Sequence, residues 1–145
     1  MEARYRLSPM RDARARDERV RRTELAGAVG DAQRLAADLD GAADRVALVR
    51  VAIADANARR DATLAQGAPI AAIARHDRYL RRLRRELDAA RGEALRAEAH
   101  HRDQLGAVDE ARRRLTLARA EREVIERHFA AWRAERRKLA ERRDD

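Results

Sequence analysis

The sequence predicts an all-α protein, a long antiparallel two-helix coiled-coil hairpin that forms one domain over residues 1–145. Two observations support this fold. The tetrapeptide QGAP at 66–69 interrupts the middle of the chain, and on each side of it apolar residues recur in alternating steps of three and four. Gly suits the position just past a helix end and Pro suits the start of a new helix, so the tetrapeptide predicts a stop followed by a start. A turn this short favours two helices that fold back on each other, and it disfavours one continuous kinked rod.

The composition is typical of a coiled coil. Charged residues make up 41% of the chain and aromatic residues 3%, so the large side chains of a compact core are scarce. The net charge is +8, with acidic and basic residues interspersed as on solvated helix faces. The lack of cysteine excludes disulfides and thiolate metal sites. We find no apolar signal segment and no run near the roughly 20 apolar residues of a membrane span, so we expect a cytoplasmic protein.

The first helix is predicted over residues 8–66. Ser8 is a suitable N-cap and Pro9 a suitable first helical residue. The first turns are poorly patterned, with only Met10, Ala13 and Val20 as apolar candidates among many charges. A regular seam then follows at Leu25, Ala28, Ala32, Leu35, Leu39, Ala42, Val46, Val49, Ile53 and Ala56.

The second helix is predicted over residues 69–142, with a longer seam. Fifteen of its twenty seam positions are apolar, and the steps of three and four alternate without a skip. The seam positions are Ile73, His76, Leu80, Leu83, Leu87, Ala90, Ala94, Ala97, His101, Gln104, Val108, Ala111, Leu115, Ala118, Arg122, Ile125, Phe129, Trp132, Arg136 and Leu139.

The second helix is the longer one, so we expect its end to extend beyond the first helix. Folding about Gly67 sets residue 53 opposite about 81 and residue 10 opposite about 124, at 1.5 Å of rise per residue. Phe129 and Trp132, two of the four aromatic residues, lie on this overhang. Either they are free to anchor a protein partner, or the N-terminal residues 5–10 cover them. The sequence leaves both alternatives open.

We expect no enzymatic activity, no cofactor and no metal. The chain carries no HExxH, nucleophile elbow or phosphate-binding Gly loop, and a two-helix hairpin offers no cleft that excludes water. His100 and His101 are adjacent on a helix, so they point about 100° apart and cannot share a metal. His76 and His101 fall on the seam and are interpreted as polar seam residues.

The densest basic stretch, RYLRRLRR at 78–85, lies just after the turn. Such a patch can bind nucleic-acid phosphates. However, Leu80 and Leu83 are seam positions, so the arginines are equally explained as residues that flank the seam. A basic coiled-coil scaffold or a nucleic-acid-binding helical hairpin is the alternative function, and we regard nucleic acid as the less favoured partner.

Three stretches together resemble a known family. They are the opening YRLSPMRD at 5–12, the segment from GAPI at 67–70 to YLRRL at 79–83, and the charged final helix at 121–143. They are similar to the aromatic-x-Leu start, the short Gly break followed by an aromatic and leucines, and the charged C-terminal helix of FliJ and YscO/SctO proteins. These proteins are the coiled-coil stalks of flagellar and injectisome type III export ATPases, and the resemblance covers nearly the whole chain.

The resemblance implies a role in protein transport. It implies a central stalk or escort that stands in the pore of a hexameric export ATPase, as the two-helix part of the gamma subunit stands in ATP synthase. The stalk would link the ATPase to the membrane export gate, contact export chaperones, and be peripheral to the membrane through partners only. Phe129 and Trp132 would enter the ATPase ring, whereas Tyr79 and Leu83 would face the gate.

One departure from the family pattern concerns the gate contact. Flagellar members can carry tyrosines late in the first helix, where this chain has Ala52 and Ala56. The choice between flagellum and injectisome therefore stays open.

Overall fold

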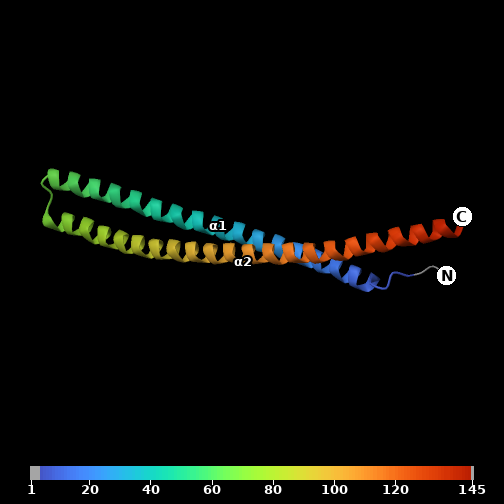
Figure 1. Ribbon diagram of the computed structural model, residues 1–145. Helices are drawn as coiled ribbons and strands as arrows, with labels where there is room; N and C mark the ends of the chain where they lie inside the picture. The colour runs from blue at the N-terminus through green and yellow to red at the C-terminus, as the bar shows by residue number, and fades with distance from the viewer. Residues whose placement is uncertain (1–3, 145) are drawn as a thin grey trace. The chain divides into compact units, whose positions relative to one another are not determined.

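The computed structural model describes residues 4–144 and contains two long helices joined by one short turn (Figure 1). Helix α1 spans Ser8–Ala65 and helix α2 spans Ile70–Asp144. They pack against each other as a helical hairpin, which confirms the predicted fold class, and their bounds lie within two residues of those predicted. Residues 1–3, part of the opening segment in which we expect no secretory signal, lie outside the described residues.

The turn ends α1 in the way that its glycine predicts. Gly67 adopts a φ of +71°, the left-handed region that a residue with a Cβ enters only with strain. The N–H of Gly67 donates to the carbonyl of Leu64 at 3.0 Å, and the N–H of Ala68 donates to that of Thr63 at 3.4 Å. These two bonds form a Schellman motif, which satisfies carbonyls that the helix end leaves unpaired.

Both helix starts are shifted by one position from the predicted caps. The carbonyl of Pro69 accepts from the N–H of Ala72 at 3.0 Å, so Pro69 precedes the first helical residue instead of being that residue. In the same way, the carbonyl of Leu7 accepts from the N–H of Arg11 at 3.0 Å. The N-cap of α1 is therefore Leu7, and Ser8 is already helical.

Contacts between residues divide the hairpin into two units, a turn unit and a chain-end unit. The turn unit comprises residues 31–104. The chain-end unit comprises the described residues of 1–30 and 105–145. Each unit contains a segment of α1 and a segment of α2.

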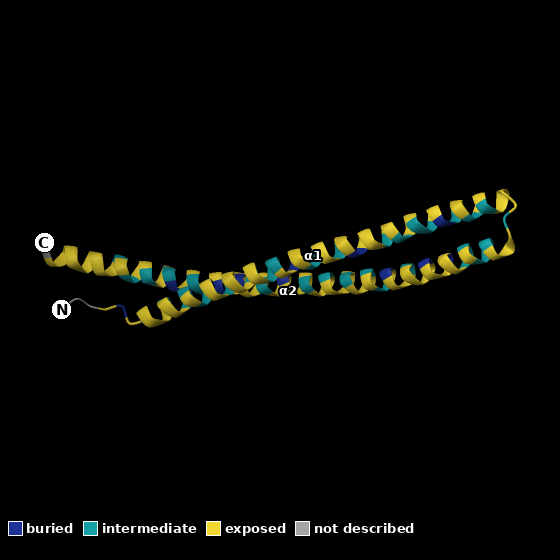
Figure 2. Cartoon of the chain, turned by 180° about the vertical axis from the view of Figure 1, so that it is seen from behind, coloured by how far each residue is buried: buried dark blue, intermediate teal, exposed yellow. Residues whose placement is uncertain are grey.

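The turn unit is held by the predicted apolar seam. A core of Ala56, Leu80 and Leu83 is buried near the turn, with Ala52 and Ile53 packed against it. Every seam position of α1 from 32 to 56 is buried or half-buried, and so is every seam position of α2 from 73 to 104. Figure 2 shows this burial on the facing sides of the two segments, with the outer sides exposed. Heptad spacing therefore identified the core of this unit.

The chain-end unit has a seam of mixed chemistry. Helix α2 contributes buried apolar side chains, and α1 faces them with long charged ones that are buried or half-buried. The apolar set is Val108, Leu115, Ala118 and Ile125, and the charged set is Arg11, Arg14, Glu18 and Arg21. Arginine stems can cover apolar surface while their guanidinium groups stay hydrated.

The register of the hairpin differs from the predicted one. In the turn unit, Arg60 contacts Asp77 at 2.6 Å, where folding about Gly67 would place a residue near 74. In the chain-end unit, Arg11 contacts Glu126 at 2.8 Å instead of a residue near 123. The predicted overhang therefore begins later than residue 124. Glu126, Phe129 and Trp132 have intramolecular partners, whereas residues 135–143 are exposed. Both ion pairs are centred between Ala68 and Pro69, in the second half of the reversal, and not on Gly67.

Candidate interaction surfaces

An aromatic cluster occupies the chain-end unit. The Tyr5 ring lies 5.0 Å from the Phe129 ring and 5.2 Å from the Trp132 ring, measured between centroids. Phe129 and Trp132 stack on each other at 5.8 Å, as expected for residues three apart on one helix. Such aromatic pairs stabilise beyond their buried area. We call Tyr5, His128, Phe129 and Trp132 the aromatic cluster.

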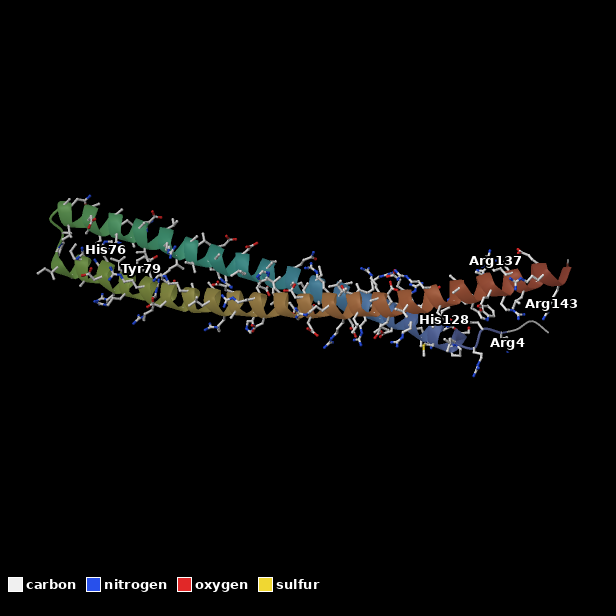
Figure 3. All side chains as sticks on the ribbon, viewed as in Figure 1. Arg4, His76, Tyr79, His128, Arg137 and Arg143 are labelled. Atoms are coloured by element: carbon white, nitrogen blue, oxygen red, sulfur yellow. The ribbon has the colours of Figure 1, made fainter. Side chains whose placement is uncertain are left out.

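Polar contacts complete this cluster. The Tyr5 hydroxyl lies 2.7 Å from Nδ1 of His128, a hydrogen bond between the segment that precedes α1 and helix α2. The guanidinium of Arg11 lies over the Phe129 ring, 4.1 Å from its centroid. A surface cavity of about 260 Å³ opens beside the cluster and is lined by Tyr5, Arg6, Leu7, His128 and Trp132. Figure 3 labels His128 and Arg4 in this part of the chain.

The structure supports the second of the two alternatives for Phe129 and Trp132, in which the N-terminal residues cover them. Tyr5 is only 8% exposed, whereas Phe129 and Trp132 are half-buried. Met10, the other end of the expected cover, is exposed at 48%. The cover is therefore Tyr5 with its neighbours, and each aromatic side chain of α2 still presents part of its surface to solvent.

Glu18 is the centre of a charged network in the chain-end unit. Its side chain is 8% exposed and accepts from Arg122 at 2.8 Å and from Arg22 at 2.8 Å, with Arg119 at 3.8 Å. The hydrogen bond from Arg122, and then the positive charges of the three arginines, hold the pKa of Glu18 below its ordinary value. Burial opposes this shift but is outweighed.

A second set of ion pairs links the same helices. Arg14 contacts Glu121 at 2.6 Å, and Arg11 contacts Glu126. The hydrogen bond from Arg11 lowers the pKa of Glu126, and the same bond raises the pKa of Arg11. These pairs align the two helices in the chain-end unit, where α1 offers few apolar side chains.

The sequence reasoning missed this charged seam, although a signal was present. Stepping back from Leu25 by four and three residues alternately reaches positions 21, 18, 14, 11 and 7. The heptad therefore continues to Leu7 with charged residues in place of apolar ones. The apolar candidates instead lie on the outside, since Met10, Ala13 and Val20 are all exposed.

The two residues proposed for gate contact have different environments. Leu83 is 5% exposed and packs inside the hairpin with Leu80 and Ala56. Tyr79 is 38% exposed, and the guanidinium of Arg82 lies 5.1 Å from its ring centroid. Tyr79 is thus accessible, whereas Leu83 belongs to the hairpin interior, and the partner contact implied for both stays a prediction. Ala52 and Ala56 pack at this leucine core.

His76 is a polar seam residue, as predicted. It is half-buried, and its Nε2 lies 3.1 Å from the hydroxyl of Thr63 on the facing helix. It also lines a cavity of about 370 Å³ with Tyr79, Arg59 and Arg75. Figure 3 labels His76 and Tyr79 close to the turn. His101 is half-buried on the seam, and His100 is exposed.

Two negative findings apply to residues 4–144. No group of three or more His, Asp or Glu side chains in this range is placed to hold a metal ion. Neither helix, over its described length, contains a stretch long and apolar enough to cross a membrane.

Comparison with known proteins yields no relative. No protein-family model, no curated protein and no solved structure matches the chain.

Proposed function

We propose that this protein is a non-enzymatic stalk or escort component of a type III protein export apparatus, flagellar or injectisome. It would bind the hexameric export ATPase, link it to the export gate protein, and contact export chaperones. This role is cytoplasmic, and the protein would reach the membrane through its partners. The observation that carries the proposal is an aromatic cluster at the paired chain ends of a helical hairpin. The FliJ-like sequence pattern supplies the identity of the partners.

The aromatic cluster has the chemistry of a protein-binding anchor. Phe129 and Trp132 are two of four aromatic residues in 145, and both keep part of their surface exposed. Aromatic and Arg side chains are enriched at interface hot spots, and Arg11 and Arg133 both lie over the Phe129 ring. A partner can therefore contact the open side of the cluster while Tyr5 supports it from the other.

The gate contact is proposed for Tyr79, with Leu83 beneath it. The exposed Tyr79 ring offers the contact, and the buried Leu83 holds the helix that carries it. A variant of Tyr79 should thus weaken gate binding without unfolding the hairpin. A variant of Leu83 should weaken gate binding and also unfold the hairpin.

The test is binding to the type III export ATPase of the same genome. Replacing both anchors, Phe129→Ala with Trp132→Ala, should weaken binding about thirtyfold, because truncating central anchors commonly costs about 2 kcal/mol or more. The matched control is Leu117→Ala with Val124→Ala, which removes two apolar residues of the same helix that are 61% and 69% exposed outside the cluster. This control should bind as the wild type does.

Circular dichroism on both double variants checks that the helices persist. If the anchor variant keeps its helicity and binds the ATPase as tightly as the control does, the docking proposal is wrong. Absence of an export ATPase from the genome would also overturn it.

A further inference from the structure

The first turns of α2 carry a dense set of arginines on the outside of the turn unit. We call them the arginine face, and all six are exposed. They are Arg75, Arg78, Arg81, Arg82, Arg84 and Arg85. Between them, the seam residues Leu80 and Leu83 turn inward. The six side chains are therefore exposed to solvent and available to a ligand.

This charge is not neutralised within the protein. Among residues 4–144, Arg82 is the only member of the face with an ion pair, to Glu86 at 3.7 Å. Asp77, the one acidic residue between positions 75 and 85, is paired with Arg60 of α1. By contrast, Arg112, Arg113 and Arg114 each pair with Asp109 or Glu110. The arginine face is thus a local excess of positive charge, whereas each arginine of the triplet at 112–114 has a carboxylate partner.

The geometry of the face suits an extended anionic surface. Residues 75–85 span about 15 Å of helix at 1.5 Å per residue, and the arginines recur at steps of one to three. A linear array of this kind presents several guanidinium groups to one surface at once. Each Arg adds attraction to a surface of anionic lipid, and the attraction decays within a Debye length.

Large apolar side chains lie exposed at the same end of the unit. Ile70, the first residue of α2, is 88% exposed, and Leu64, one residue before the end of α1, is 47% exposed. Ile70 and Arg81 are eleven residues apart, close to three helical turns, so they share a line along the helix. Single exposed apolar residues are ordinary. Ile70, however, lies at the tip of the hairpin and in line with Arg81 of the arginine face.

The aromatic residue of this region distinguishes between two anionic partners. Single-stranded nucleic acids gain much of their affinity by stacking bases on exposed aromatic faces. The Tyr79 ring already has the Arg82 guanidinium 5.1 Å from its centroid, so that face is occupied. Phosphodiester strands also offer no environment for Ile70. A lipid surface offers both phosphate groups and an apolar boundary.

We infer that the turn end of the hairpin binds directly to an anionic phospholipid surface. The arginine face contacts the phosphate groups, and Ile70 enters the boundary between headgroups and acyl chains. This direct contact goes beyond the association through partners proposed above. It does not depend on the export function, because it rests on the arginines, Ile70 and Tyr79 alone.

The test is co-sedimentation of the full chain with vesicles of phosphatidylcholine alone or with about a quarter phosphatidylglycerol. The wild type should bind only the anionic vesicles, and less at high salt. Replacing three arginines, Arg78→Gln, Arg81→Gln and Arg85→Gln, should weaken binding about a hundredfold, at about fivefold for each charge near the surface.

The matched control removes the same charge from the paired triplet, with Arg112→Gln, Arg113→Gln and Arg114→Gln. It should lose less than about threefold in binding, because each of those arginines is already engaged by a neighbouring carboxylate. Equal loss in both triple variants would mean that net charge alone drives binding, and it would overturn the inference.

The variant Ile70→Ser distinguishes binding to a lipid surface from binding to a nucleic acid. This variant should weaken vesicle binding severalfold and leave binding to a single-stranded oligonucleotide unchanged. If the wild type binds the oligonucleotide more tightly than the anionic vesicles at equal salt, and Ile70→Ser has no effect on vesicles, the face is a nucleic-acid site and the lipid assignment is wrong.

Discussion

The turn unit and the chain-end unit use one heptad geometry with different chemistry. In the turn unit both helices supply apolar seam residues, with Ala56 beneath Leu80 and Leu83. In the chain-end unit α2 supplies apolar residues, and α1 supplies Arg11, Arg14 and Glu18 at the same spacing. Knobs-into-holes spacing decides which positions face the partner helix. The side-chain type at those positions decides how strongly they hold it.

The difference indicates a division of roles within the hairpin. Apolar burial at the turn involves no charges that salt can screen, and it resists separation of the helices. The ion pairs and the covering Tyr5 of the chain-end unit contribute less to stability, and the ion pairs respond to salt and pH. The chain-end unit, which carries the proposed ATPase anchors, is thus the unit that a partner can rearrange at lower cost.

The largest effect is expected in the turn unit, from Leu83→Ala. Truncating a buried leucine costs about 2–5 kcal/mol of unfolding free energy, because it removes apolar contacts and leaves a cavity. Leu95→Ala is the control, since Leu95 is 67% exposed, and it should change stability by no more than about 0.5 kcal/mol. Urea unfolding followed by circular dichroism measures both. Similar small losses in the two variants would mean that Leu83 is not a core residue in solution.

The next largest effect is expected at the turn itself, from Gly67→Ala. The added Cβ meets nothing within 4 Å, so the cost is that of holding Ala at a φ of +71°, about 1–2 kcal/mol. Gly41→Ala is a matched control whose expected effect on stability has the opposite sign. Its Cβ also meets nothing, but Gly41 lies inside α1, so Ala should stabilise by up to about 1 kcal/mol. If both variants lower the melting temperature, the left-handed turn is not the source of the cost.

A smaller effect is expected in the chain-end unit on acidification. The pKa values of Glu18 and Glu126 are lowered in the folded protein by hydrogen bonds from Arg122 and Arg11. A lowered folded pKa contributes stability above the ordinary value of 4.5, and this contribution is lost as the pH falls through the folded pKa. The chain-end unit should therefore loosen below about pH 4.5, while the leucine core persists.

Trp132 is the only tryptophan, so its fluorescence reports this loosening directly. Its emission should shift to the red in acid at a higher pH than the one at which the helical circular dichroism signal is lost. Glu18→Gln should shift it already at neutral pH and reduce the acid dependence. An acid response of the variant identical to that of the wild type would remove Glu18 from the explanation.

The smallest effect is expected from Tyr5→Phe. It removes the hydrogen bond to His128 but keeps the ring, so it should cost about 0.5–1.5 kcal/mol locally. The Trp132 emission should stay near that of the wild type. Tyr5→Ala removes the ring as well and should shift the emission to the red. Equal emission in both variants would show that Tyr5 does not cover Trp132 in solution.

The sequence alone predicted the turn at 66–69 and two helices within two residues of their observed bounds. It also predicted a seam that the structure buries, except at its last two positions, Arg136 and Leu139, which are exposed. It also predicted that His76 is a seam residue. These features are local or periodic. Gly at a left-handed position and a repeat of three and four residues act through the backbone of the segment that contains them. The resemblance to export stalks likewise rests on the residues alone.

Only the tertiary structure decided how the chain ends are paired. The register, with Arg11 at Glu126, brought Tyr5 onto Phe129 and Trp132, and it turned a predicted overhang into a covered cluster. It also showed that charged residues occupy the seam of α1 near Glu18. The physical reason is that a heptad specifies which face of a helix is buried but not where along the partner it lies. That offset is decided by contacts between residues more than a hundred positions apart, such as Glu18 with Arg122.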